Sequence, residues 1–196
     1  VKVTRPCRTS GAADLTRFGR RLILIVTVAM VVVSVAARAQ SARTAEIDAL
    51  TAAYLFRFFD FVTWPAEPAA VETEVRIGLV GASHLKPVFS AAEGRPAGDS
   101  RGSLVVDDLG SYSDGLDLAR YRILFIGSEE GAALDRILEE VRGHPVLLVR
   151  DIDGFVDAGG MIGLRVHDRR LRWDLGLGSM REAGLEICQT DEIWIR

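Results

Sequence analysis

Cysteine and histidine are scarce in this 196-residue sequence, which holds two cysteines and three histidines. None of His84, His144 and His167 is spaced from another as metal ligands are, and a single cysteine cannot form a structural zinc site. We therefore expect no metal centre. Cys7 lies in a segment that we expect to be removed, so Cys188 has no disulfide partner. We predict that Cys188 is a small buried apolar residue rather than a reactive thiol.

The sequence also lacks the motifs of common catalytic and cofactor sites. It has no P-loop, no G-x-G-x-x-G and no G-x-S-x-G motif. Asp151–Gly154 resembles part of a calcium loop but lacks the third acidic position and the later glutamate, so it predicts a turn. The acid pairs Asp107-Asp108 and Glu129-Glu130 are adjacent, so their side chains point apart and fit solvated surface better than a catalytic dyad. We expect no enzyme activity and no cofactor.

Positive charge is scarce after residue 39. Residues 1–39 carry seven basic residues and one acid, whereas residues 40–196 carry 17 basic and 26 acidic residues. A domain with that net charge of −9 is a poor partner for nucleic acid or for an anionic membrane surface.

The longest apolar run, Leu22–Ala37, lies in a segment typical of an export signal. Basic residues precede it, and the tripeptide Ala37-Arg38-Ala39 places small residues where a signal peptidase requires them. We predict a signal peptide over residues 1–39, cleavage after Ala39, and a periplasmic domain over residues 40–196. The alternative is an uncleaved anchor in the inner membrane, but 16 residues are fewer than the ~20 that span a bilayer. The pair Arg20-Arg21 also allows a twin-arginine signal.

Aromatic residues concentrate in Ala45–Val62, a segment that predicts a helix ending before Pro65. Apolar residues recur there at helical spacing and predict one buried stripe. The residues of this stripe are Ile47, Leu50, Tyr54, Phe58, Phe61 and Val62.

Phe56 and Phe59 lie off that stripe and form a second apolar face with Ala52 and Thr63. This pattern predicts either a helix buried on two sides within its own domain, or a helix that packs on its domain with one face and on a partner with the other. In the second case, Phe56 and Phe59 contact a partner protein or a second copy of the chain in a homodimer.

Strands and helices alternate after a linker over residues 65–74 and predict an α/β fold. Ile123–Ile126 and Val146–Val149 have no polar alternation, which fits central parallel strands covered on both faces. Met161–Val166 and Leu171–Leu175 alternate and predict a C-terminal antiparallel hairpin with the turn His167–Arg170. We expect a single layered domain with a mixed sheet and flanking helices, preceded by the aromatic-rich helix. The other predicted elements are strands at Val75–Val80 and Leu104–Val106, a turn over Asp107–Gly115, and helices at Ser83–Ala92, Glu129–Val141 and Ser179–Ala183.

Two strand ends, Leu79–Ser83 and Phe125–Ser128, each lead into a predicted helix with a serine available as its N-cap. Two glutamates follow the second strand end and would repel an anion. Ligands of open parallel sheets bind beyond the carboxyl ends of the strands, so the first strand end is a candidate site for a small anion or nucleotide. Serine capping alone explains the same pattern. The residues of this candidate anion site are Gly81, Ser83, His84 and Lys86.

Five stretches follow one another behind the predicted signal in a distinctive order. They are Ala53–Pro65, Ile123–Glu129, Pro145–Val149, Gly154–Ile162 and Ala183–Ile187. Their order and spacing resemble those of the YfiR-like family of periplasmic proteins, over about residues 45–190. Each stretch also fits a scaffold role; for example, the paired glycines at 159 and 160 permit a sharp turn into the hairpin.

The resemblance implies a regulatory, non-catalytic role. In the namesake of the family, the soluble protein binds the periplasmic part of a membrane diguanylate cyclase and holds it inactive. Release raises cyclic di-GMP and favours biofilm. Other relatives are linked to sensor kinases, so the implied partner is a membrane diguanylate cyclase or a sensor kinase. This sequence cannot form the disulfides of the namesake, and Gly176 replaces the usual asparagine before the last helix.

Overall fold

The computed structural model describes residues 30, 38, 40–65, 73–98, 102–167 and 170–188. The predicted signal peptide and its cleavage site after Ala39 lie outside the described residues, apart from residues 30 and 38. The chain divides into two compact units, residues 1–45 and 46–196. Within the described ranges, no helix combines the length and hydropathy needed to cross a membrane.

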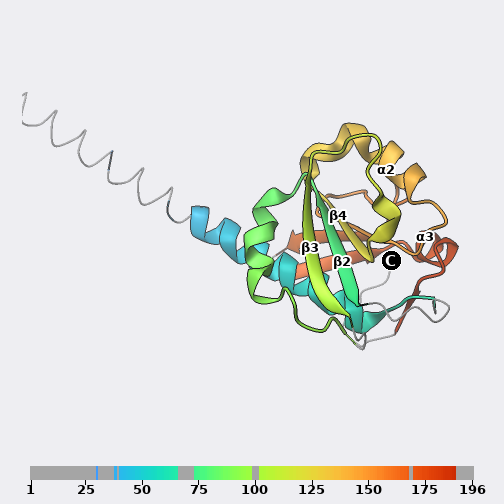
Figure 1. Ribbon diagram of the computed structural model, residues 1–196. Coiled ribbons are helices and arrows are strands. Elements are labelled where there is room, and N and C mark those ends of the chain that lie inside the picture. The colour runs from blue at the N-terminus through green and yellow to red at the C-terminus, as the bar shows by residue number, and fades with distance from the viewer. Residues whose placement is uncertain are drawn as a thin grey trace, which may run out of the picture. The chain divides into compact units, whose positions relative to one another are not determined.

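A six-stranded sheet forms the centre of the second unit (Figure 1). Its order is β3-β2-β4-β5-β6-β7, and neighbouring strands are parallel except for the antiparallel pair β6–β7. Every residue of β4 (Ile123–Ile126) and β5 (Leu147–Arg150) is buried, as expected for central strands covered on both faces. The predicted α/β fold with a mixed sheet and a C-terminal hairpin is confirmed. The other strands are β2 (Glu74–Val80), β3 (Ser103–Gly110), β6 (Ile162–His167) and β7 (Arg170–Leu175).

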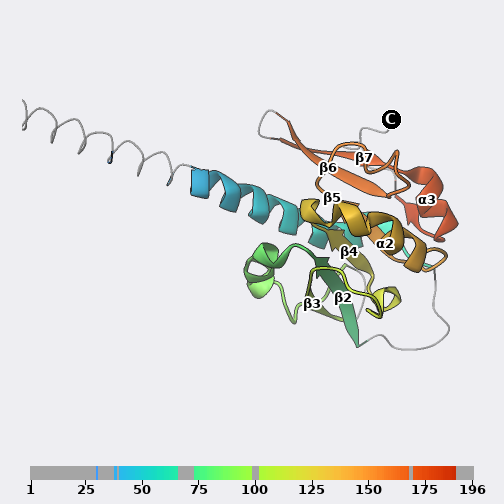
Figure 2. The same ribbon diagram turned by 90° about the horizontal axis from the view of Figure 1, so that it is seen from above.

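Helices lie on both faces of this sheet (Figures 1 and 2). The N-terminal helix, residues 46–61 of this unit, contacts Trp173 on one face. Leu148 belongs to the opposite face, where it lies with α2 (Leu134–Glu140) and α3 (Leu177–Glu182). Three 3-10 helices complete the unit: η1 (Ser83–Ala91), η2 (Leu118–Arg120) and η3 (Ser128–Ala133).

The N-terminal helix continues directly into a second, two-stranded sheet. Its strand β1 (Val62–Thr63) pairs antiparallel with β8 (Glu186–Ile187), and Val62 lies opposite Ile187. The end of the first helix is therefore joined by hydrogen bonds to the end of the last strand.

Several of the predicted elements differ from the structure. The predicted hairpin turn His167–Arg170 is too long, because His167 ends β6, Arg170 begins β7, and the two residues pair with each other. The predicted turn over Asp107–Gly115 starts later, because β3 stays paired with β2 as far as Gly110. The predicted helix Ser83–Ala92 is a 3-10 helix that contains Pro87, a residue that an α-helix interior does not accommodate. The predicted helix Glu129–Val141 divides into η3 and α2, because Glu130 has non-helical backbone angles and turns its side chain inward.

Glycines shape the start and the end of the hairpin. A side chain at Gly160 would collide with the ring of Phe155, and one at Gly176 would collide with the carbonyl oxygen of Gly160. The predicted sharp turn into the hairpin is confirmed, since Gly159 has a φ of 97°.

Cys188 is exposed, so the prediction that it is buried is wrong. It follows the last residue of β8, and its Sγ lies 3.6 Å from Thr63 Oγ1 at the end of the two-stranded sheet.

Candidate functional site

The N-terminal helix is held on the sheet by an aromatic cluster around Trp173 of β7. The ring of Trp173 meets Phe58 edge-on at 5.2 Å and Tyr54 at 5.6 Å, and Phe61 lies 5.9 Å away. Phe58 is fully buried, which agrees with the predicted stripe. The centre of the buried face also includes Leu55, fully buried, which the predicted stripe omits, whereas Ile47 at its start is 40% exposed.

Phe56 and Phe59 are half-buried and contact the edge of the core. The ring of Phe59 stacks on Trp64 at a centroid distance of 5.5 Å. Ala52, assigned to the same face, is buried, whereas Thr63 is exposed. The second apolar face is thus covered in part by its own domain and keeps two partly accessible aromatic rings.

Two exposed charged residues, Arg57 and Asp60, lie on the same turns of the helix as these rings. Arg57 is exposed, and its guanidinium lies 5.1 Å from the centroid of the Phe61 ring, a cation–π contact. Asp60 is exposed on the same turn. We refer to Phe56, Arg57, Phe59, Asp60 and Thr63 as the helix surface. A partly apolar centre with a charged rim is a common arrangement at protein–protein interfaces.

Carboxylates of the chain face the polar side chains of the candidate anion site. Ser83 Oγ donates a hydrogen bond of 2.8 Å to Asp108, and His84 Nε2 lies 3.7 Å from Asp48 Oδ1. Lys86 Nζ donates to Glu93 at 2.5 Å and to the carbonyl oxygen of Val106. These carboxylates would repel a second anion at the same place.

The serine caps predicted for this region are not formed. Ala82 is the N-cap of η1 and Gly127 that of η3, and neither helix has a side-chain capping hydrogen bond. Gly127 N–H instead donates to the carbonyl oxygen of Val80 at 2.8 Å, so the two strand ends pack directly against each other.

Glu130 lies beside the turn at Gly81. A Cβ atom placed on Gly81 would stand 2.8 Å from Glu130 Oε1, and Glu130 Oε2 accepts a hydrogen bond from Tyr112 N–H at 3.3 Å. Glu130 is 9% exposed, so its assignment to solvated surface is wrong. Because β2 and β4 are neighbours, a glutamate that follows one strand end lies against the other as well.

Asp107 is the centre of a polar network on β2 and β3. It accepts hydrogen bonds from Arg76 at 2.8 Å, Arg120 at 3.2 Å and Tyr121 at 3.3 Å. Burial raises the pKa of Asp107, but the hydrogen bonds from the two arginines outweigh this effect, and the pKa lies below its usual value. Asp108, the next residue, points the other way and bonds Ser83, as the alternation of a strand requires.

Arg150 is a buried cation that the sequence analysis did not single out. It is 2% exposed; its Nη2 donates to the carbonyl oxygen of Ser128 at 3.0 Å, and its Nε has no hydrogen-bond partner. The strand predicted over Val146–Val149 extends in the structure to Arg150. Within the part of the chain that the structure describes, no group of three or more His, Cys, Asp or Glu side chains is placed to hold a metal ion.

The fold and the helix surface define a class of protein. It is an α/β domain with a six-stranded mixed sheet, and an aromatic N-terminal helix packs on one face of that sheet. The family model for YfiR/HmsC-like proteins matches residues 48–189, and the chain belongs to this family. The match runs from the N-terminal helix to the end of β8, so it covers both sheets. The family is one of periplasmic regulatory proteins.

Proposed function

We propose that this chain is a periplasmic adaptor that represses a membrane diguanylate cyclase by binding the periplasmic domain of the cyclase. The observation that carries this proposal is the YfiR/HmsC-like match over both sheets of the domain. The predicted export signal over residues 1–39 supports it, because it places the domain on the same side of the membrane as the receptor part of such an enzyme.

Repression of this kind requires a difference in binding between two states of the cyclase. An adaptor lowers the active fraction only as far as it binds the inactive state more tightly than the active one. A tenfold reduction of cyclase activity needs about 1.4 kcal/mol of differential binding free energy. An interface that includes two aromatic rings supplies such a difference readily.

We place the contact with the cyclase, or with a second copy of the chain, at the helix surface. Phe56 and Phe59 offer aromatic area there that the domain leaves half-accessible. Arg57 and Asp60 at the border provide charges of both signs, which favour one orientation of the partner.

The first test is the level of cyclic di-GMP in cells with and without the gene for this chain. We expect a clear rise on deletion, reversed by the full chain but not by a matched copy that starts at residue 40 and stays in the cytoplasm. An unchanged level in the deletion strain would contradict repression of a cyclase. In that case, crosslinking of the exported chain to a sensor kinase in the strain that carries the gene would identify the other partner class.

A further inference from the structure

Arg150, the last residue of β5, is a buried charge without a counter-charge. It is 2% exposed, and it forms no ion pair with any carboxylate in the part of the chain that the structure describes. Its Nη2 donates to the carbonyl oxygen of Ser128, whereas its Nε has no hydrogen-bond partner. An arginine side chain stays protonated in proteins, so this charge persists in the folded domain. Burial of a charge costs free energy that one carbonyl acceptor offsets only in part.

The neighbouring strands supply no acceptor side chain to this guanidinium group. Arg150 lies opposite Ile126 of β4 and Gly163 of β6, and neither has a polar side chain. Asp174 of β7 lies opposite Gly163 in the same row across the sheet, but its carboxylate accepts a hydrogen bond of 2.6 Å from Arg165. The row of residues that crosses the sheet at Arg150 therefore leaves its charge unmatched.

The guanidinium group lies at the edge of the sheet where ligands of parallel strands bind. Arg150 ends β5, and Ser128 begins η3 shortly after the end of β4, so both lie at the carboxyl ends of parallel strands. Gly131 of η3 is exposed. Among the atoms that the structure describes outside the backbone of η3, only Arg150 Nη2 comes within 4 Å of a Cβ placed on Gly131, at 3.7 Å. The space beside Gly131 thus gives a small ion an approach to the guanidinium group.

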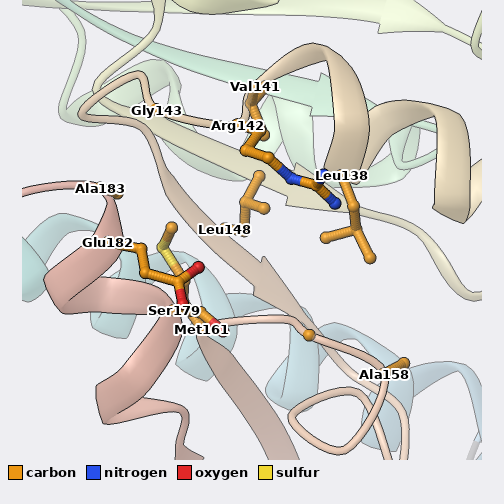
Figure 3. A pocket seen from close by; sticks show the side chains of 11 residues that line it. Leu138, Val141, Arg142, Gly143, Leu148, Ala158, Met161, Ser179, Glu182 and Ala183 are labelled. Atoms are coloured by element: carbon orange, nitrogen blue, oxygen red, sulfur yellow. The ribbon is translucent and has the colours of Figure 1, made fainter.

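Arg142 provides a comparison on the same face of the sheet. It borders a pocket of about 160 Å³ between α2 and α3 (Figure 3). Its side chain is 70% exposed and pairs with Glu139 at 2.9 Å, so water and a carboxylate already stabilise its charge. The two arginines carry the same charge, but only Arg150 lacks both solvent and a counter-charge.

We propose that Arg150 binds a small inorganic anion, a halide or an oxyanion such as phosphate. The anion accepts a hydrogen bond from Nε–H and neutralises the buried charge, and hydrogen bonds between a guanidinium group and an anion are among the strong ones. The net charge of −9 over residues 40–196 opposes the approach of an anion, but salt screens this repulsion beyond about 8 Å at physiological ionic strength.

The test is thermal unfolding of the purified protein at constant ionic strength, with chloride or phosphate in place of the bulky anion gluconate. A ligand of the folded state at about five times its Kd raises the ratio of folded to unfolded protein about sixfold. For a domain of this size, that change raises Tm by roughly 3 °C. We expect such a rise for the natural chain, and separate titrations with chloride and with phosphate show which anion causes it.

Two arginine variants locate the effect. Arg150→Met should lose the dependence of Tm on the anion, because the buried charge is gone. Arg142→Met is the matched control and should keep it, since it removes an exposed arginine from the same face. Circular dichroism checks that both are folded. An equal dependence on the anion in the natural chain and in folded Arg150→Met would overturn the proposal, as would a Tm of the natural chain that is the same in chloride, phosphate and gluconate.

Crystals of the natural chain give a second measurement if Arg150→Met fails to fold. Bromide replaces chloride in one set of crystals and arsenate replaces phosphate in another, and anomalous scattering locates both ions. We expect a peak at hydrogen-bond distance from Arg150 Nε in at least one set, and no peak there in either set would contradict the site. All of these measurements use the protein alone, so their outcome is independent of the proposed repression.

Discussion

Asp107 shows how a single carboxylate can hold two strands and a loop together. We expect Asp107→Asn to lower the free energy of unfolding by about 1 kcal/mol at pH 7, because the hydrogen bonds from Arg76 and Arg120 lose their charge assistance. We expect no larger effect because the side chain of Asp107 is 28% exposed, so solvent screens its ion pair with Arg76. Urea denaturation of the variant and of the natural chain measures the difference.

The same residue predicts a dependence on pH. The pKa of Asp107 is lower in the folded chain than in the unfolded chain, so its stabilising effect is complete above the unfolded value of about 3.9. It is lost as the pH falls through the lower, folded value. The difference between the natural chain and Asp107→Asn should therefore shrink in acid, and a constant difference would contradict the assigned role. Asp108→Asn is the matched control, with an expected change within about 0.5 kcal/mol.

Gly176 and Gly178 lie two residues apart, and we expect an alanine substitution to have opposite effects on stability at the two positions. Gly176→Ala should lower the free energy of unfolding by about 1–3 kcal/mol, because its Cβ would collide with the Gly160 carbonyl oxygen. Gly178→Ala should raise it by up to about 1 kcal/mol, since Gly178 lies within α3 and no atom lies within 4 Å of its added Cβ. Thermal unfolding of the two variants measures these changes. If Gly176→Ala were as stable as the natural chain, the loop at Gly160 would have moved to make room for the added Cβ.

Some residues gave no usable signal in the sequence. Glu130 and Arg150 look like ordinary charged residues after apolar strands, and their burial depends on which strands are neighbours. The prediction that Asp107 and Asp108 point apart is confirmed, because side chains alternate along a strand. The two arginines that bond Asp107 come from β2 and η2, and nothing near Asp107 in the sequence marks them. These long-range contacts depend on the order of the strands in the sheet, which cannot be derived from a single sequence.

Among the elements, the N-terminal helix carries the clearest functional prediction. Phe59→Glu is expected to raise cyclic di-GMP to the level of the deletion strain, or to abolish self-association, while the circular dichroism spectrum stays native. The reason is that the change places a charge in the apolar centre of the helix surface. The measurements are the cellular nucleotide level and the molar mass of the purified protein.

Ile152→Glu is the matched control for this helix, because Ile152 is also an accessible apolar residue, 39% exposed, but lies in the loop after β5. It should leave both measurements unchanged. If Phe59→Glu unfolds the domain, Phe59 belongs to the core, as the stacking on Trp64 would allow. If it folds and still represses, the contact lies elsewhere.

Elements with a strong pattern were predictable and those with a weak one were not. The bounds of β4 match the prediction, because a run of four apolar residues without polar alternation is typical of a central strand covered on both faces. The segments of η1 and η3 were predicted as helices, but their 3-10 form was not, because over one or two turns a period of 3.0 residues is hard to tell from that of an α-helix. Their shape is imposed by the strands and side chains around them.

At the scale of the whole molecule, the fold class and the order of its parts followed from the sequence, and the layout of its surfaces did not. The pocket between α2 and α3 combines residues from 138 to 183, and no local motif marks it. The position of Phe56 and Phe59 off the buried stripe was predictable because helical periodicity is local, and their contact with a partner stays a prediction. How far the ring of Phe59 is covered depends on Trp64, which lies beyond the end of the helix.

The pairing of β1 with β8 also sets an order of assembly. The helix that leads into β1 is the first part of the domain to be synthesised, yet Val62 pairs with Ile187, and Trp173 completes its aromatic cluster. Thr63 and Cys188, which meet beside that pair, are 125 residues apart in the chain. During synthesis, β1 at the end of this helix therefore has no partner strand until β8 has left the ribosome. A chain that ends at Leu185, just before β8, would keep every strand of the six-stranded sheet but lose the partner of β1, and its aromatic helix would be left open to chaperones and proteases.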